Sequence, residues 1–181
     1  MTILRLSRAF ASDRRGVSAV EFAMLLPLML TLYLGTVEIS QGVSIDRKAT
    51  LTARTVGDLV TQYSSINNAT MTNILNASAK IVAPYPDEPL KVTVSAVTIA
   101  ADKTAKITWT DTLKGTNPHR PGDPVTDIPE ALKVPNTQLI WAETEYKYTP
   151  TIGYVLTGPL TLSEKIYMRP RISDSIARTA N

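Results

Sequence analysis

The chain has 181 residues, which suffices for one domain and an appendage, and it contains no cysteine and one histidine. The lack of cysteine excludes disulfides, thiolate metal sites and a cysteine nucleophile. The net charge of +3 arises before Val17, because 15 of the 19 basic and 15 of the 16 acidic residues follow Gly16; the body of the protein is therefore not basic and gives no sign of nucleic-acid binding.

A long apolar segment follows the basic start. From Val17 to Val37 the only charged residue is Glu21, and Phe22–Val37 has none. About 20 helical residues, at roughly 1.5 Å each, cross the hydrocarbon core of a bilayer. The segment is apolar on all sides, which predicts a membrane-spanning helix. Arginines before it predict a cytoplasmic N-terminus and an exported C-terminal part.

Four interpretations of this segment are open. A cleaved secretory signal would end in a small-residue cleavage site, but Thr36–Ser40 continues in a helix-like pattern. A twin-arginine signal at Arg14–Arg15 lacks such a site as well. An uncleaved anchor explains the apolar run but leaves Gly16 and Glu21 unexplained. A processed, pilin-like helix explains both residues.

The helical pattern continues beyond the membrane segment. Apolar residues recur at helical spacings as far as Tyr63, with polar residues between them, so one helix is predicted from about Val17 to Tyr63. Pro27 cannot donate a backbone hydrogen bond and is predicted to kink this helix, a defect that membrane helices tolerate.

The start of the helix resembles a known processing site. Gly16-Val17-Ser18-Ala19-Val20-Glu21-Phe22, with basic residues before it, resembles that of type IV pilin-like proteins, and most closely the TadE-like minor pilins (pseudopilins) of the Tad/Flp tight-adherence system. The resemblance is strong over residues 14–45. It implies cleavage by a membrane prepilin peptidase between Gly16 and Val17, leaving Glu21 fifth and Phe22 sixth. The leader is longer than processing requires. Two segments nearer the C-terminus, Tyr146–Pro150 and Met168–Arg171, also look TadE-like.

A charge pair would explain why Glu21 is present in such a protein. After cleavage, Val17 carries a free ammonium at the bilayer, and a carboxylate one helical turn along neutralises it, in its own chain or in a neighbour. An unpaired charge in the membrane is costly, and a pair offsets the cost and specifies register. Gly16 suits the cut because it puts no side chain in the way of a protease. The alternative is that Glu21 reaches the headgroups of an ordinary anchor.

The remaining two thirds alternate between elements and turns. Residues 68–83 predict a second helix, Lys91–Ile99 and Ala105–Thr110 a β-hairpin, and Gln138–Tyr148 a third strand. Residues 114–137 form an irregular excursion with a helical turn at 128–133. Leu160–Met168 predicts a fourth strand that needs a bulge or a shift of face.

These elements predict an α+β fold, in which a long N-terminal helix packs on a small, roughly four-stranded antiparallel sheet, as in type IV pilins. The expected parts are a cleaved cytoplasmic leader (1–16), the long helix (17–66) and an exported globular domain (67–181). We expect Val56, Leu59 and Tyr63 to face a core made by Val92, Val94, Ile107, Trp109 and Trp141. The aromatic residues are expected to fill the core rather than to form an adhesive patch: Trp109, Trp141, Tyr146, Tyr148 and Tyr154.

The sequence contains no catalytic constellation. His119 is expected to be a solvated loop histidine, and no metal, cofactor or phosphate-binding motif is present. We therefore expect no enzyme. Partner contacts are expected in the excursion at 114–137 and in the loop Gly153–Gly158.

The resemblance implies a minor pilin that initiates, primes or caps a Tad-type (type IVc) pilus for surface adhesion. Its implied partners are the prepilin peptidase, the major Flp-type pilin, other minor pilins, the inner-membrane Tad assembly platform and membrane lipid, with no nucleic acid. The implied location is the bacterial inner membrane, as a single-pass protein, and then the pilus or cell surface. The alternative is an uncleaved single-pass anchor that presents an exported binding or assembly-scaffold module.

Overall fold

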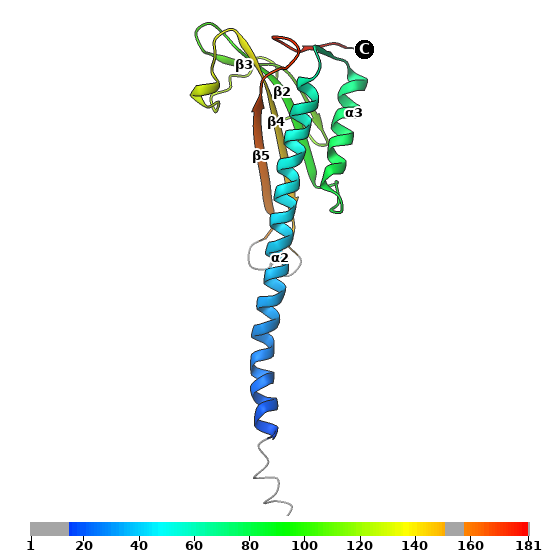
Figure 1. Ribbon diagram of the computed structural model, residues 1–181, viewed down its shortest axis with the longest axis vertical. Coiled ribbons are helices and arrows are strands. Elements are labelled where there is room, and N and C mark those ends of the chain that lie inside the picture. The colour runs from blue at the N-terminus through cyan, green and yellow to red at the C-terminus, as the bar shows by residue number, and fades with distance from the viewer. Residues whose placement is uncertain (1–14, 151–157, 181) are drawn as a thin grey trace, which may run out of the picture.

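One long helix runs through the whole molecule. The computed structural model describes residues 15–150 and 158–180, and its helix α2 (Arg15–Thr61) is 47 residues long. In Figure 1 the first half of α2 projects away from the globular part, whereas the second half lies against the sheet. We call residues 16–37 the apolar half and residues 38–61 the packed half.

The sheet has four antiparallel strands in the order β3-β2-β4-β5. They are β2 (Leu90–Ile99), β3 (Ala105–Leu113), β4 (Thr137–Tyr148) and β5 (Leu160–Met168). The helix α3 (Asn68–Ala79), extended by the 3-10 turn η1 (Lys80–Val82), packs beside α2. The predicted α+β class, with a long helix on a four-stranded antiparallel sheet, is confirmed.

The second helix follows from local sequence. The side chain of Asn67 accepts a hydrogen bond from the backbone of Thr70 at 2.8 Å, which caps the helix start. The residues with helical spacing are all buried: Met71, Ile74, Leu75, Ala79 and Val82. This part of the core, together with Val56, Val92, Val94 and Trp109, fills the space between the two helices and the sheet.

A one-residue bulge overturns part of the expected core. Ala96 pairs with Trp109 and Val97 pairs with Ile107, so Thr108 is an extra residue in β3. The bulge reverses the alternation, and Trp109 faces the helices while Ile107 faces the opposite side of the sheet. The expectation that Ile107 faces the helix is wrong for this reason.

Two further core predictions are wrong. Trp141 neighbours Ile140 and Ala142, which face the helices, so strict alternation along β4 turns Trp141 to the outer face. Tyr63 follows the end of α2 and is 40% exposed. Leu59 is partly buried against the helix-side core, as expected.

The fourth strand needs no bulge. Its register with β4 is unbroken from Ile140 opposite Met168 to Tyr148 opposite Leu160. Leu160 and Leu162 therefore lie on the helix side, and Lys165 and Tyr167 lie on the outer side. The predicted shift of face is wrong, because the outer face accepts both of these long side chains.

The outer face of the sheet carries a second core. The excursion, with the 3-10 turn η2 (Glu130–Leu132) inside the predicted helical turn, places Val125 and Ile128 against β2, β3 and β4. The C-terminal segment closes the far end of the domain through β6 (Ala177–Arg178), which pairs in parallel with β1 (Ser65–Ile66). Arg178 makes a two-point ion pair with Asp111, with N–O distances of 2.8 and 3.0 Å.

Candidate functional site

Most of the apolar half of α2 packs against nothing else in the described part of the chain. Every side chain from residue 16 to residue 33 is exposed, and the first buried side chain along the helix is Ile45. The helix is long and apolar enough to cross a membrane. A helix that is apolar and exposed on all sides favours an apolar environment, which the described part of the chain does not supply.

The five predicted site residues lie on this half. Gly16 and Val17 are in the first turn of α2, Glu21 and Phe22 follow one turn later, and Pro27 lies further along. Glu21 has no hydrogen-bond or ion-pair partner among the side chains described from residue 16 to 150 and from 158 to 180. Arg14, the first arginine of the pair in the motif, lies outside the described residues.

The conformation of Gly16 gives no packing reason for a glycine. A Cβ atom added at Gly16 would meet no atom within 4 Å. Glycine inside a helix costs up to about 1 kcal/mol relative to alanine. Within the described part of the chain, no close contact requires a glycine at this position.

Helix α2 continues without a break through Pro27, which is its thirteenth residue. The hydroxyl of Thr31 donates a hydrogen bond to the carbonyl oxygen of Pro27 at 2.8 Å. The kink at Pro27 stays a prediction.

The globular domain packs on α2 directly after the apolar half ends. The hydroxyl of Tyr148 donates to the carbonyl oxygen of Glu38 at 3.3 Å, and a Cβ at Gly42 would lie 3.5 Å from the Tyr148 ring. Higher up, the hydroxyl of Thr144 donates to the carbonyl oxygen of Ala49 at 3.1 Å. The sheet and helix therefore form one packed body that begins where the uncharged segment ends.

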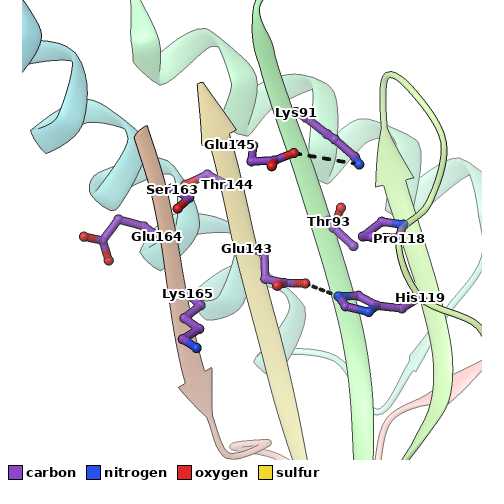
Figure 2. Close-up of a pocket in the computed structure, with 10 residues that line it drawn as sticks. All are labelled: Lys91, Thr93, Pro118, His119, Glu143, Thr144, Glu145, Ser163, Glu164 and Lys165. Atoms are coloured by element: carbon purple, nitrogen blue, oxygen red, sulfur yellow. Dashed lines mark hydrogen bonds and ion pairs between the residues drawn. The ribbon is translucent and has the colours of Figure 1, made fainter. Parts of the chain in front are cut away.

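The outer face of the sheet carries a polar pocket of about 340 Å³. Figure 2 shows His119, from the excursion, pointing at Glu143 on β4, with Lys91 and Glu145 facing each other nearby. The His119 Nε2 atom lies 2.5 Å from Glu143 Oε2, and Lys91 Nζ lies 3.9 Å from Glu145 Oε2. Only 19% of the His119 side chain is exposed. The expectation of a solvated loop histidine is wrong, because the excursion folds back onto the sheet.

Aromatic rings lie close to the contact between His119 and Glu143. The ring centre of His119 lies 4.5 Å from that of Trp141, which stacks on Tyr167 at 5.6 Å. Burial raises the pKa of the Glu143 carboxyl, and the hydrogen bond to His119 opposes that rise. Burial, together with the charge of Glu143, raises the pKa of Tyr167 to about 12. The pair holds the excursion against the sheet.

Among the described residues no group of three histidine or carboxylate side chains is placed to hold a metal ion. Four of the five aromatic residues named from the sequence are at most 9% exposed, so the core interpretation is confirmed for Trp109, Trp141, Tyr146 and Tyr148. Tyr154 and most of the loop Gly153–Gly158 lie outside the described residues.

Sequence reasoning missed the pairing of His119 because its partner is 24 positions away on another element. The available signal was the alternation along β4, which places Glu143 on the same face of the sheet as Trp141. This alternation does not indicate which loop covers that face.

Most of the long helix matches a known protein family. Residues 16–58 match the family model described as TadE-like protein. The match begins at Gly16, contains all five predicted site residues, and confirms the resemblance to TadE-like proteins of the Tad system. Neither the comparison with curated proteins nor that with solved structures gave a match.

Proposed function

We propose that this chain, whose residues 16–58 match the TadE-like family, is a minor pilin that initiates, primes or caps a Tad-type pilus. One observation carries the proposal. An exposed apolar half-helix bears a lone carboxylate near its start and continues into a packed domain. That arrangement suits a subunit held first by a bilayer and then by other helices. TadE-like proteins are structural pilus-associated proteins, and we propose no enzymatic activity.

In the proposed mechanism a prepilin peptidase cuts between Gly16 and Val17. The new ammonium at Val17 then lies one helical turn from Glu21, which has no partner in the described chain. Pairing of the two charges, within one chain or between neighbours, removes the cost of an unpaired charge in the membrane. A neighbour in the wrong register would leave the charges unmatched.

The size of the domain supports a low-copy position. The packed half of α2 is covered by β4 and β5 on one side and by α3 on another, which makes a bulky head on the helix. The resemblance implies that the major Flp-type pilins are tiny, so a subunit with this large head would serve badly as the repeating unit. We therefore place this subunit at an end of the filament, with the major Flp-type pilin, other minor pilins and the inner-membrane assembly platform as partners.

The proposed orientation follows from the charges. Arginines precede the apolar half, so the N-terminus is cytoplasmic and the globular domain is exported. Membrane lipid surrounds residues 16–37 before assembly, and the exported head reaches the pilus or cell surface, where it supports adhesion.

Replacement of Glu21 tests this function. Glu21→Ala and Glu21→Gln are both expected to abolish surface pili while the protein stays in the membrane fraction, since each removes the negative charge. Val20→Ala, at a neighbouring position that is also exposed, is the matched control and should leave piliation intact. Piliation is counted by electron microscopy and by shearing pili from cells. Normal piliation in both Glu21 variants would contradict the essential charge pair and favour the uncleaved anchor.

A further inference from the structure

One side of the packed half of α2 is left uncovered by the described part of the chain. The strands β4 and β5 pack on one side of the helix and α3 packs on another. On the side away from the buried Ala49 and Ala53, helical geometry places Arg47, Leu51 and Arg54 in one line. All three side chains are exposed, Leu51 by 52%. We call Arg47, Leu51 and Arg54 the outward stripe.

The two arginines of the outward stripe are unpaired among the described residues, where neither side chain makes a hydrogen bond or an ion pair. Asp58 lies one turn above Arg54 on the same side, but it pairs with Arg171 of the C-terminal segment and accepts a hydrogen bond from Gln62 at 3.0 Å. The stripe therefore presents two cations on either side of an exposed leucine. A helix with carboxylates at the matching levels and an apolar side chain between them complements this pattern.

The outward stripe continues the exposed surface of the apolar half. Down the helix from Arg47, Ser40 and Thr36 follow on the same side, and both are exposed. Arg47 lies about 15 Å, and Arg54 about 25 Å, beyond the end of the uncharged segment at Val37. A second helix that lies beside the apolar half in the same bilayer therefore reaches the stripe after about three further turns.

A second copy of this chain does not complement the stripe. At equal depth in the membrane, two copies that face each other through the stripe bring Arg47 against Arg47 and Arg54 against Arg54, and like charges in contact oppose association. A shift along the axis large enough to avoid this draws charged residues of one copy into the bilayer or apolar residues of the other out of it. The occupant that fits is a different chain.

We propose that the outward stripe binds the helix of a different single-pass subunit, which is apolar beside the apolar half and carries carboxylates at the levels of Arg47 and Arg54. Each guanidinium then pairs with a carboxylate, and Leu51 packs between the two pairs. The inference rests on the proposed function, which places companion subunits in the same membrane, and it names the surface that recognises one of them. Because the contact joins unlike chains, it adds no further copies of this chain and agrees with a low-copy position.

Photo-cross-linking at the outward stripe tests the contact. The photoreactive amino acid p-benzoylphenylalanine is placed at Leu51 of the full-length chain, which is co-expressed in its own membrane with one tagged pilin-like subunit of the same Tad system at a time. We expect an adduct with one of these subunits, and the cross-linked peptide should contain carboxylates. The same amino acid at Asn76, an exposed residue of α3, is the matched control and should give little adduct.

Reversal of the charges tests the recognition. The double variant Arg47→Glu, Arg54→Glu should lower the adduct about tenfold, whereas Arg47→Lys, Arg54→Lys keeps both charges and should retain most of it. Lysines in place of the partner carboxylates that the cross-link locates should restore the adduct of the glutamate variant. Because both arginines are exposed and unpaired among the described residues, neither double variant should change the unfolding of the domain.

Three results would overturn the inference. One is an adduct with this chain alone, which would make the occupant a second copy. Another is the lack of any protein adduct at position 51 in membrane-inserted chains, which would leave the stripe facing solvent. The third is an adduct whose yield does not respond to charge reversal, which would remove the arginines from the recognition.

The inference and the proposed function fail separately. The same membranes are assayed for chains that start at Val17, and the cells are assayed for pili. Absence of a charge-sensitive adduct among processed chains in piliated cells overturns the inference and leaves the minor-pilin function standing. A charge-sensitive adduct formed by chains that keep residues 1–16 supports the contact and contradicts the function.

Discussion

The two halves of α2 belong to one unbroken helix but depend on different surroundings. In the apolar half every described side chain up to Tyr33 is exposed, whereas in the packed half Ala49, Ala53 and Val56 are fully buried. The packed half is amphipathic and is stabilised by the sheet and by α3. The apolar half is apolar on all sides and depends on lipid or on other helices. A substitution should therefore affect the stability of the domain only in the packed half.

The largest difference is expected between two glycines. A Cβ at Gly57 would lie 3.0 Å from Met168 Sδ and 3.5 Å from Ala142 Cβ, whereas a Cβ at Gly35 would meet nothing within 4 Å. Gly57→Leu should lower the free energy of unfolding by about 3 kcal/mol through overpacking. Gly35→Leu should change it by less than about 0.5 kcal/mol. Urea unfolding in detergent, followed by tryptophan fluorescence, measures both. Equal losses would show that the halves are not independent.

A smaller difference is expected between two threonines. Thr144 is buried and donates its hydroxyl hydrogen bond across to the carbonyl oxygen of Ala49, whereas the exposed Thr31 bonds only to its own helix. Thr144→Val should cost about 1 kcal/mol of unfolding free energy, since it removes a buried hydrogen bond that joins helix to sheet. Thr31→Val should have no measurable effect on the same denaturation curve. A neutral Thr144→Val would mean that this bond does not hold the two elements together.

The smallest effect concerns pH and arises on the outer face of the sheet. Burial raises the pKa of Glu143 above its unfolded value, so the folded state holds this proton more tightly. Its contribution to stability is therefore largest at acid pH and is lost as pH rises from the unfolded to the raised folded pKa. Glu143→Gln should flatten the stability profile over that window. Denaturation midpoints of both proteins across the acid range measure this, and parallel profiles would contradict it.

The fold was predictable where hydrophobic periodicity is strong. The long helix, the second helix and the four strands all follow the spacing of their apolar residues, because these spacings decide which face is buried. Thr108 could not be predicted as a bulge, since it is β-branched like Ile107 and Thr110 and carries no turn signal. The bulge then exchanged the faces of Ile107 and Trp109. The regular register of β5 could not be predicted, because it places Lys165 on the outer face of the sheet. There Lys165 pairs with Asp127 of the excursion, a partner that the strand sequence does not indicate.

The features of the candidate site were likewise predictable only where they depend on a local pattern in the sequence. Gly16, Glu21 and Phe22 could be singled out from the sequence, because the role that we propose for them depends on local order along the chain. The contact between His119 and Glu143 was not, because it depends on how a proline-rich excursion returns to the sheet. The contact of Tyr148 with α2 beside Gly42 was equally hidden, since it forms only when the end of β4 meets the helix.

The N-terminus of the mature protein is the most direct test of the account. Intact mass and N-terminal sequencing of protein taken from its own membrane, with and without the prepilin peptidase, measure it. We predict a chain that starts at Val17 only when the peptidase is present, which supplies the ammonium that Glu21 requires. A chain that keeps residues 1–16 in the presence of the peptidase would contradict the account and leave an ordinary membrane anchor.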